Sequence, residues 1–448
     1  MKNRLILLGL IGLLLSCEPA SKQSPTEEEQ TQSAISNESL LDSIQYRTFQ
    51  YFWEGAEPTS GLARERFHVD GVYPQDDKNV ITSGGSGFGI MAILVGMHRG
   101  FITQHEGYER LVKIVSWLEK ADRFHGVWPH WIYGETGKTK PFSKKDDGGD
   151  LVETSFLIQG LLSARQYFYK GGEKEKALGD RIDQLWREVE WSWHQGPDQE
   201  NIVFWHWSPN FGWDMNFRIN GYNECLITYV LAASSPTYPI PAAAYHEGWA
   251  QNGNITGGPT KYGYHLDFKH IGAPEYGGPL FWSHYSFLGL DPRQLKDKYA
   301  DYWEHNKNHV LIDQKYCIEN PHGYKGYGAD CWGLTSSYSL KGYSSHKPEK
   351  DLGVIAPTAA LSSFPYAPEQ CMEVARHFYT DMADQLWGPY GFYDAFSEQE
   401  NWFPKKYLAI DQGPIVVMIE NYRSGLLWDL FMSCPEVQDG LTKLGFTY

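Results

Sequence analysis

Three acidic positions in this sequence stand at the starts of apolar segments, where carboxylates can do acid–base chemistry. The first holds a pair, Asp150 and Glu153, three residues apart at the beginning of an apolar segment. At a helix start this spacing puts both side chains on one face. The same Asp-x-x-Glu spacing also forms a capping box, which satisfies free backbone amides and complements the helix dipole. Taken alone, this pair is better explained by capping than by chemistry.

The second and third positions each offer a single acid. Glu224 precedes the apolar stretch 225–233, and Asp411 precedes an apolar run that begins at Ile415. Pro414 suits a first helical turn, so we expect Asp411 just outside that helix. Either acid can also cap a helix or brace a turn. Convergence of all three positions on one rim of the fold is what favours chemistry over capping.

Hydrolysis of a glycosidic bond needs two carboxyl groups, one protonated to assist the leaving oxygen and one ionised to activate water. We assign Glu224 as the general acid and Asp411 as the base, with Glu153 as the first replacement for the base. Asp150 and Glu153 are expected to bind sugar hydroxyls and tune Glu224. The sequence holds no Gly-x-Ser-x-Gly elbow, no His-Glu-x-x-His pair and no paired Cys-x-x-Cys. No metal or cofactor is predicted.

Aromatic residues are unusually frequent, with 29 Tyr, 17 Trp and 22 Phe, which exceeds the needs of a helical core. Flat rings with a polar edge suit the faces and hydroxyl rims of sugars. Many of the rings lie in long loops, and long loops in a compact domain are usually functional. The predicted substrate-binding side chains are Trp128, His130, Asp150, Trp205, Trp213, Tyr222, His284 and Trp332. For any single Trp, a place in the core is the competing explanation.

Helical periodicity dominates the chain, and strand-like alternation is scarce. The expected helices lie near 38–54, 87–100, 105–121, 151–170, 178–193, 222–234, 279–288, 294–306, 369–386, 414–432 and 436–444. Paired helices joined by long loops predict an all-α, (α/α) toroid as one domain over 38–448. An open helical solenoid is the alternative, although no repeat of fixed period is present. The Gly-rich segment 83–89 is interpreted as a close-packed helix start.

The N-terminus has the pattern of a lipoprotein export signal. Lys2 and Arg4 precede a short apolar run that ends in Leu-Leu-Ser-Cys, which predicts cleavage and lipidation at Cys17. An ordinary secretion signal is the alternative, and both place the protein outside the cytoplasm, in the periplasm or at the cell surface. Residues 18–37 are rich in Ser, Thr, Gln and Glu and are expected to form a disordered tether. The lipid would anchor the protein to a membrane.

The net charge of −16 argues against nucleic acid as a partner, because such binding depends on clustered Lys and Arg. A neutral or cationic ligand fits better, and the predicted partner is an oligo- or polysaccharide. The cysteines beyond Cys17 are odd in number and imply no disulfide framework. A pairing of Cys317 with Cys331 is left open.

Several short motifs, in this order, resemble the bacterial glucoamylase-like proteins and, within them, glycoside hydrolase family 144, the endo-β-1,2-glucanases. The resemblance covers nearly all of 38–448 and rests on segments 86–89, 149–154, 221–224, 279–284, 331–335, 356–360, 364–369 and 410–414. It implies an (α/α)6 toroid, action on β-1,2-glucan with inversion, no cofactor, and important acids at Asp150, Glu153 and Glu224. The segment 126–130 reads Gly-Val-Trp-Pro-His, where the family has Gly, Phe and Tyr before a His, so linkage and chain-length preference stay open.

Two other functions compete with a hydrolase. A surface glycan-binding lipoprotein would need the aromatic rings but not the acids at three helix starts, which therefore favour an enzyme. A polysaccharide lyase on a similar toroid would need basic residues to neutralise uronic acids, and the acidic balance of the chain argues against it.

Overall fold

The computed structural model describes residues 35–448 except Gln199. The predicted signal segment, Cys17 and the tether up to residue 34 lie outside the described residues. Ile35 packs against the core and Ser36 caps the first helix.

Helices are the main regular structure of the described chain. The α-helices are α1 (Asn37–Trp53), α2 (Ser83–Arg99), α3 (Gln104–Leu118), α4 (Leu151–Phe168), α5 (Glu173–Arg187), α6 (Leu226–Ser234), α7 (Tyr302–Glu319), α8 (Pro357–Leu361), α9 (Pro368–Thr380), α10 (Ala383–Leu386), α11 (Ala409–Arg423), α12 (Leu426–Met432) and α13 (Pro435–Leu444). Short 3-10 or π turns are η1 (Trp191–Gln195), η2 (Ala244–Trp249), η3 (Gln251–Gly253), η4 (Leu280–Ser283) and η5 (Tyr285–Leu288).

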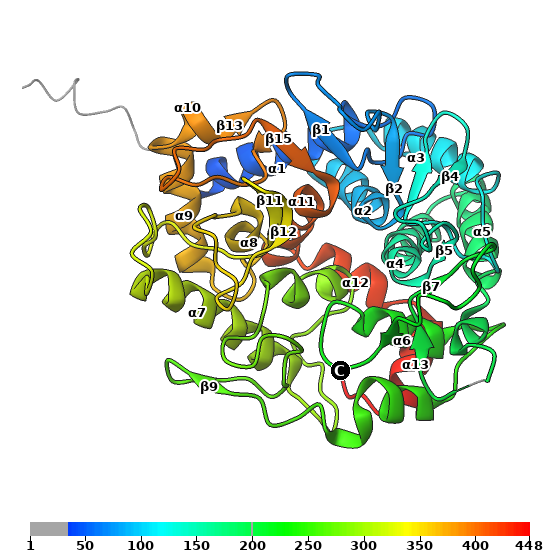
Figure 1. Ribbon diagram of the computed structural model, residues 1–448. Helices are drawn as coiled ribbons and strands as arrows, with labels where there is room; N and C mark the ends of the chain where they lie inside the picture. Colours follow the sequence, from blue (N-terminus) through cyan, green and yellow to red (C-terminus); the bar gives the residue numbers. More distant parts are fainter. Residues whose placement is uncertain (1–34, 199) are drawn as a thin grey trace, which may run out of the picture.

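The helices form a closed ring around a central region (Figure 1). Helix α2 packs against both α4 and α11, and α1 packs against α2 and α11, so the last long helix joins the first pair. On the other side of the ring, α4 contacts α6 and α12, and α13 covers α6. The predicted all-α, (α/α)6 toroid is confirmed, and the open solenoid is wrong because these contacts close the ring.

The strands are short and pair at the ends of the helices. They are β1 (Arg66–His68) with β15 (Lys406–Leu408), β2 (Val80–Thr82) with β3 (Trp131–Tyr133) and β4 (Lys138–Lys140), β5 (Gly149–Asp150) with β7 (His206–Trp207), β6 (Val203–Phe204) with β8 (Arg218–Ile219), β9 (Thr260–Lys261) with β10 (Tyr264–His265), β11 (Ser336–Ser339) with β12 (Gly342–Ser345), and β13 (Trp387–Gly388) with β14 (Gly391–Phe392). Every one of these pairs is antiparallel. They hold loops that are distant in sequence beside each other.

Glycines allow α2 and α4 to approach closely. A Cβ on Gly87 would lie 2.1 Å from the carbonyl oxygen of Phe156, and a Cβ on Gly160 would lie 2.2 Å from the carbonyl oxygen of Gly87. Any side chain here would force the helices apart. The interpretation of 83–89 as a close-packed helix start is confirmed. This contact fixes the two helix starts that carry part of the site.

Several expected helices differ from the observed ones. Segment 279–288 forms only the short turns η4 and η5, and segment 369–386 is divided between α9 and α10. Segment 294–306 is mostly loop, because Lys296 pairs with Thr447 and the helix starts only where Asp301 caps α7. Segment 178–193 is divided between α5, which starts earlier, and η1. Helix α11 begins at Ala409, so Asp411 lies inside its first turn and Pro414 lies within the helix rather than at its start. In each case tertiary contacts override local pattern.

Among the described residues, no helix is long and apolar enough to cross a membrane. The five cysteines of the described chain are buried free thiols, so Cys317 and Cys331 are not joined.

Candidate active site

A cavity of about 530 Å³ opens at one end of the toroid, a size that suits a small oligosaccharide segment. Its lining residues come from many elements and include Glu65, Arg66, His68, Asp77, His130, Trp131, Phe142, Glu153, Phe156, Trp205, Glu224, Phe281, Tyr285, Tyr338, Tyr343, Lys406, Leu408 and Ile410. The lining therefore combines aromatic rings with several charged groups.

Two of the predicted acids, Glu153 and Glu224, line this cavity. Glu153 is fixed in place because its Oε2 accepts the backbone N–H of Gly84 at 2.8 Å and the hydroxyl of Thr82 at 3.2 Å, both at the start of α2. Burial raises the pKa of Glu153 to about 7 and that of Glu224 to about 7. Burial therefore favours the protonated form of each carboxyl, the condition that suits a general acid.

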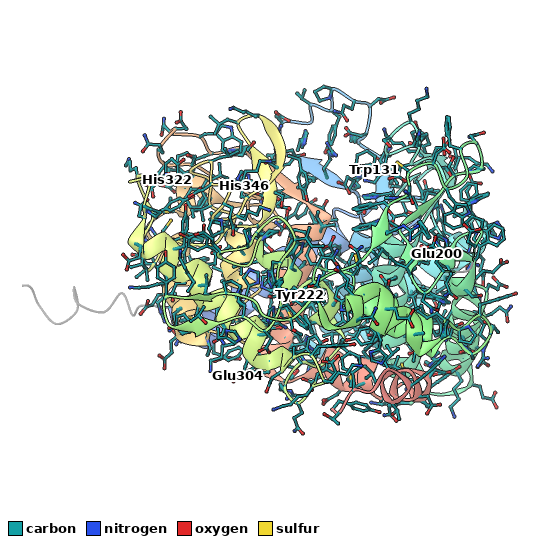
Figure 2. All side chains as sticks on the ribbon, turned by 60° about the horizontal axis from the view of Figure 1, so that its bottom comes forward. Trp131, Glu200, Tyr222, Glu304, His322 and His346 are labelled. Carbon is teal, nitrogen blue, oxygen red and sulfur yellow. The ribbon has the colours of Figure 1, made fainter. Side chains whose placement is uncertain are left out.

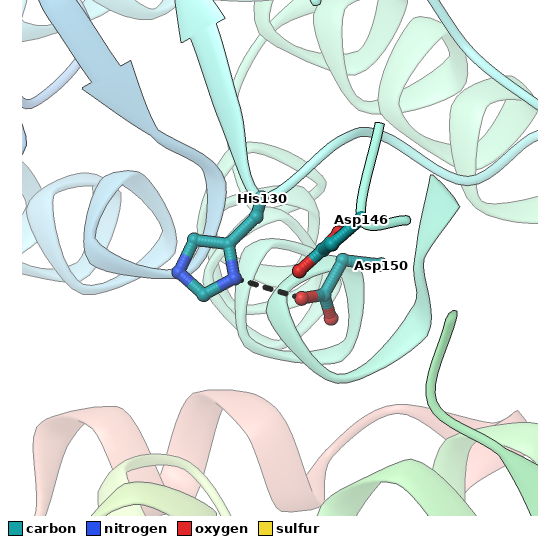
Figure 3. A group of neighbouring side chains, drawn as sticks. All are labelled: His130, Asp146 and Asp150. Carbon is teal, nitrogen blue, oxygen red and sulfur yellow. Dashed lines mark hydrogen bonds and ion pairs between the residues drawn. The ribbon is translucent and has the colours of Figure 1, made fainter. Parts of the chain in front are cut away.

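Asp150 caps α4 and lies directly behind the cavity wall. Its Oδ1 accepts the backbone N–H groups of Val152 and Glu153, each at 3.0 Å. Its Oδ2 lies 2.9 Å from Nδ1 of His130 (Figure 3). Burial alone would raise the pKa of Asp150, but hydrogen bonds from His130 and His206 hold it well below its usual range. The capping interpretation is therefore confirmed, whereas Asp150 is buried and does not line the cavity, so its predicted contact with a sugar hydroxyl stays a prediction.

His130 is held as an imidazolium. Burial would lower its pKa, yet the charge of Glu153 and the hydrogen bond to Asp150 raise the pKa to about 10. Its Nε2 lies 3.9 Å from Oε1 of Glu153. The ring of Phe142 stacks on it with centroids 4.2 Å apart. A cation with one face covered and one N–H turned to the cavity can donate to a sugar hydroxyl.

Asp411, predicted as the base, lies behind the cavity wall rather than on it. It is 1% exposed, whereas its neighbours Leu408 and Ile410 line the cavity. Burial raises its pKa well above the usual range, and its carboxyl hydrogen-bonds to that of Asp394. Burial, and after it the charge of Asp411, raises the pKa values of the lining residues Tyr285 and Tyr343. Asp411 is therefore close to the cavity but separated from it by side chains.

Only one of the four predicted tryptophans meets the cavity. Trp205 lines it and stacks on Phe217 with centroids 5.0 Å apart. Trp213 belongs to a separate aromatic group with Trp193 and Phe204. Trp128 and Trp332 are 0% exposed, so their prediction as sugar-binding rings is wrong. Both fill the core of the toroid, the competing explanation that applied to any single Trp.

Tyr222 and His284 are likewise buried and do not line the cavity. The Tyr222 hydroxyl donates to Asn306 Oδ1 at 2.8 Å, and the residue lies well away from Trp131 in Figure 2. His284 Nε2 lies 2.9 Å from the Ser363 hydroxyl. Both satisfy polar groups within the core, so their prediction as substrate-binding residues is wrong.

The sequence analysis did not identify several of the residues that line the cavity. Glu65, Arg66 and Lys406 come from the paired strands β1 and β15 and their flanks, and Tyr343 comes from the hairpin β11–β12. No spacing in the sequence links these segments. Trp131 carried a signal, because it directly follows the predicted His130 in an aromatic loop.

Among the described residues, His130, Asp146 and Asp150 form a group whose ligand atoms lie close enough to hold a metal ion. His206 joins the same group, with Nε2 3.2 Å from Asp146 Oδ2 and 3.5 Å from Asp150 Oδ2. The pKa of His206 is raised to about 9, because the two carboxylates outweigh the effect of burial. The raised pKa values of both histidines, beside two acidic side chains, favour an ion-pair network over a metal centre.

A cavity with two carboxyls of raised pKa and an aromatic lining, at the end of an α/α toroid, defines the site of a glycoside hydrolase. The endo-β-1,2-glucanase of Chitinophaga pinensis, solved with sophorotriose and glucose, is 65% identical, with a TM-score of 0.91 over 93% of this chain and 99% of that one. The chain belongs to this glucoamylase-like family of glycoside hydrolases, glycoside hydrolase family 144. A family model described as "Putative glucoamylase" matches residues 216–435.

A second relative has a longer chain. The exo-β-1,2-glucooligosaccharide sophorohydrolase of Parabacteroides distasonis is 48% identical over 443 residues, which are 94% of this chain and 60% of that protein. A β-1,2-glucanase structure from the same organism has a TM-score of 0.86 over 92% of this chain and 60% of that one. The chain thus spans 60% of the length of this curated relative.

Proposed function

We propose that this protein hydrolyses β-1,2-glucan. The observation that carries the proposal is the placement of Glu153 and Glu224, two carboxyls with pKa values of about 7, in one aromatic cavity. This arrangement occurs in a chain that shares 65% identity with an endo-β-1,2-glucanase over almost the whole of both proteins. The substrate class follows from that similarity, and the chemistry follows from the carboxyls.

In the proposed mechanism Glu224 donates a proton to the glycosidic oxygen as the bond to the anomeric carbon breaks. A water molecule attacks that carbon from the opposite face and inverts its configuration. Asp411 is the proposed acceptor of the proton from water, and it must be ionised to act, although burial raises its pKa well above the usual range. Its carboxyl does not line the cavity, so one intervening water or a small movement of the wall must connect them. Glu153 is the alternative base, because it already faces the cavity.

The remaining cavity residues bind and orient the sugar. Trp131 and Trp205 offer ring surfaces, and His130 offers a charged N–H donor. Stacking on a ring combined with a few directed hydrogen bonds is how proteins select sugars of one shape.

The test is to incubate the purified domain with β-1,2-, β-1,3-, β-1,6- and α-1,4-glucans and to separate the products. We expect turnover of the β-1,2-glucan alone. Mixed oligosaccharides early in the reaction would indicate endo cleavage, whereas a single disaccharide product would indicate exo cleavage. Preference for another linkage would overturn the proposed substrate.

We further propose that the protein is a lipoprotein with one catalytic domain, anchored to a membrane outside the cytoplasm through Cys17. The support is the Leu-Leu-Ser-Cys segment and the polar stretch that follows it. Metabolic labelling with a fatty acid analogue should mark the wild-type protein but not Cys17→Ala. Equal labelling of both proteins would rule out lipidation at this residue.

A further inference from the structure

Behind the cavity, four side chains form a network that we call the His/Asp network: His130, Asp146, Asp150 and His206. Figure 3 shows His130 bonded to Asp150, with Asp146 beside them. Only His130 lines the cavity. Asp146 and His206 are 4% and 8% exposed, and neither was singled out by the sequence.

The backbone places each member of the network. Strands β5 and β7 pair Asp150 directly opposite His206. A tight turn in which the backbone N–H of Asp146 donates to the carbonyl of Ser143 at 3.2 Å brings the Asp146 carboxylate to the same point. The carboxylate of Asp146 lies 3.2 Å from His206 Nε2, and Asp150 lies within 3.5 Å of both imidazoles. The network is therefore built by the fold and not by flexible surface side chains.

The network ends at a catalytic carboxyl. His130 bridges it to Glu153, with 3.9 Å between His130 Nε2 and Glu153 Oε1. The charge of Asp150 acts on both Glu153 and Glu224 and favours their protonated forms. A change in the charge of the network therefore changes the charge state of the acids in the cavity.

We propose that Asp146 and His206 are positioning residues of the active site, which hold Asp150 and His130 charged and in place and thereby set the protonation of Glu153 and Glu224. This proposal rests on the proposed function only for its kinetic test. The other titratable groups near the network are His194, which burial keeps neutral, and Glu65, which acts on Glu153 from β1's flank.

The first experiment compares the pH dependence of kcat/KM on β-1,2-glucan for His206→Gln, Asp146→Asn and the double variant. Loss of the His206 cation makes the cavity more negative and should move the alkaline limb up by a few tenths of a pH unit, on the order expected for charges within a partly buried site. Loss of the Asp146 carboxylate should move the alkaline limb to lower pH. This shift should be smaller, because His206 then loses its proton more easily and the loss of its positive charge partly offsets the loss of the negative charge. The double variant should return the limb close to that of the wild type.

Asp147→Asn is the matched control. The Asp147 carboxylate contacts Asn210 at 2.7 Å and the hydroxyl of Ser208, so it lies on the same loop but outside the network. We expect this variant to keep the wild-type pH profile. Shifts in the same direction for both single variants, or a lower Tm without any shift, would show that the network only supports packing and would overturn the proposal.

A second measurement does not depend on activity. In protein with isotope-labelled histidine, NMR should show His130 and His206 still protonated at pH 8, since their pKa values are about 10 and about 9. The titration of His206 should move to lower pH in Asp146→Asn. Neutral imidazoles at pH 8 in the wild type would contradict the proposal even if the protein hydrolyses the glucan. Loss of stability on dialysis against EDTA, restored by Zn²⁺, would identify a metal site and also overturn it.

Discussion

The carboxyl groups of Asp394 and Asp411 are hydrogen-bonded to each other in the protein interior. Asp394 Oδ2 also accepts the backbone N–H of Tyr338 at 2.7 Å. Asp394 Oδ1 and Asp411 Oδ2 are both buried and meet no donor group of the described protein. Two touching carboxyls in such surroundings cannot both be ionised, so a proton must lie between them. Burial raises the pKa of Asp394 to about 6 and that of Asp411 well above its usual range.

A shared proton predicts different effects for the two Asn variants. Asp411→Asn removes the proposed base and should lower kcat by about 10²–10⁴-fold. Asp394→Asn gives Asp411 an amide donor and removes the charge of Asp394, which lowers the pKa of Asp411. A base works when ionised, so the acid limb of kcat/KM should move to lower pH, with a smaller loss of turnover. Kinetics from pH 4.5 to 8 measure both effects. An unmoved acid limb in Asp394→Asn would show that the pair does not share a proton, and exposed Asp384→Asn is the control.

The acid is tested by substituting Glu224 and Glu153 in parallel. Glu224→Gln should lower kcat by about 10²–10⁴-fold on glucan but by much less on an aryl glycoside, whose leaving group needs no proton. Because the pKa of Glu224 is about 7, the activity of the wild type should fall as the pH rises above 7. Proton NMR of fresh products should show the inverted anomer. If Glu153→Gln and not Asp411→Asn abolishes turnover, Glu153 is the base, and a retained anomer would exclude inversion.

Substitutions of two tryptophans should distinguish an effect on substrate binding from an effect on stability. Trp205 lines the cavity, so Trp205→Ala should raise KM, with a loss of about 1–3 kcal/mol of substrate binding. Trp332 is 0% exposed, so Trp332→Ala should lower stability by about 3–5 kcal/mol. Steady-state kinetics and thermal unfolding measure the two effects. An unchanged KM for Trp205→Ala would show that this ring does not contact the sugar.

The sequence predicted the toroid and part of the site for an identifiable physical reason. Helical periodicity is local, and the starts of α4 and α6 carry Glu153 and Glu224 into the cavity as expected. The distance of a residue from the cavity surface depends on tertiary contacts and not on the local sequence. Asp411 is displaced from the cavity because α11 begins earlier than its Pro414 indicated, and that start depends on strand β15 pairing with β1.

Burial was the other property that sequence could not supply. Trp128 and Trp205 occur in similar aromatic loops, yet one fills the core and the other lines the cavity. Asp146 and His206 gave no signal at all, because their relation to Asp150 arises from the pairing of β5 with β7. Contacts between short strands determine which side chains meet at the site, and no periodic pattern in the sequence indicates these contacts.

A buried cluster of neutral histidines predicts a loss of stability in acid. His305 accepts the backbone N–H of Asp267 at Nδ1, so its Nε2–H donates to His270 Nε2 at 3.0 Å, and His270 donates in turn to the carbonyl of Gly277. His309 accepts from Ser283 at 2.8 Å and donates to the carbonyl of Gly278 at 3.0 Å. None of these rings can take a second proton without breaking a hydrogen bond.

Burial lowers the pKa of His309 to about 4 and those of His270 and His305 well below the usual value. In the unfolded chain they titrate near pH 6.5, so the unfolded state binds more protons below that pH. Stability should therefore be complete above about pH 6.5 and should fall as the pH drops from 6.5 towards 4. His309→Gln keeps both hydrogen bonds but cannot titrate, and it should reduce the slope by about 1.4 kcal/mol per pH unit. Urea unfolding at pH 7.5, 6.0 and 5.0 measures this slope. Exposed His322→Gln is the control, and an equal slope in His309→Gln and the wild type would show that His309 is already charged in the folded protein.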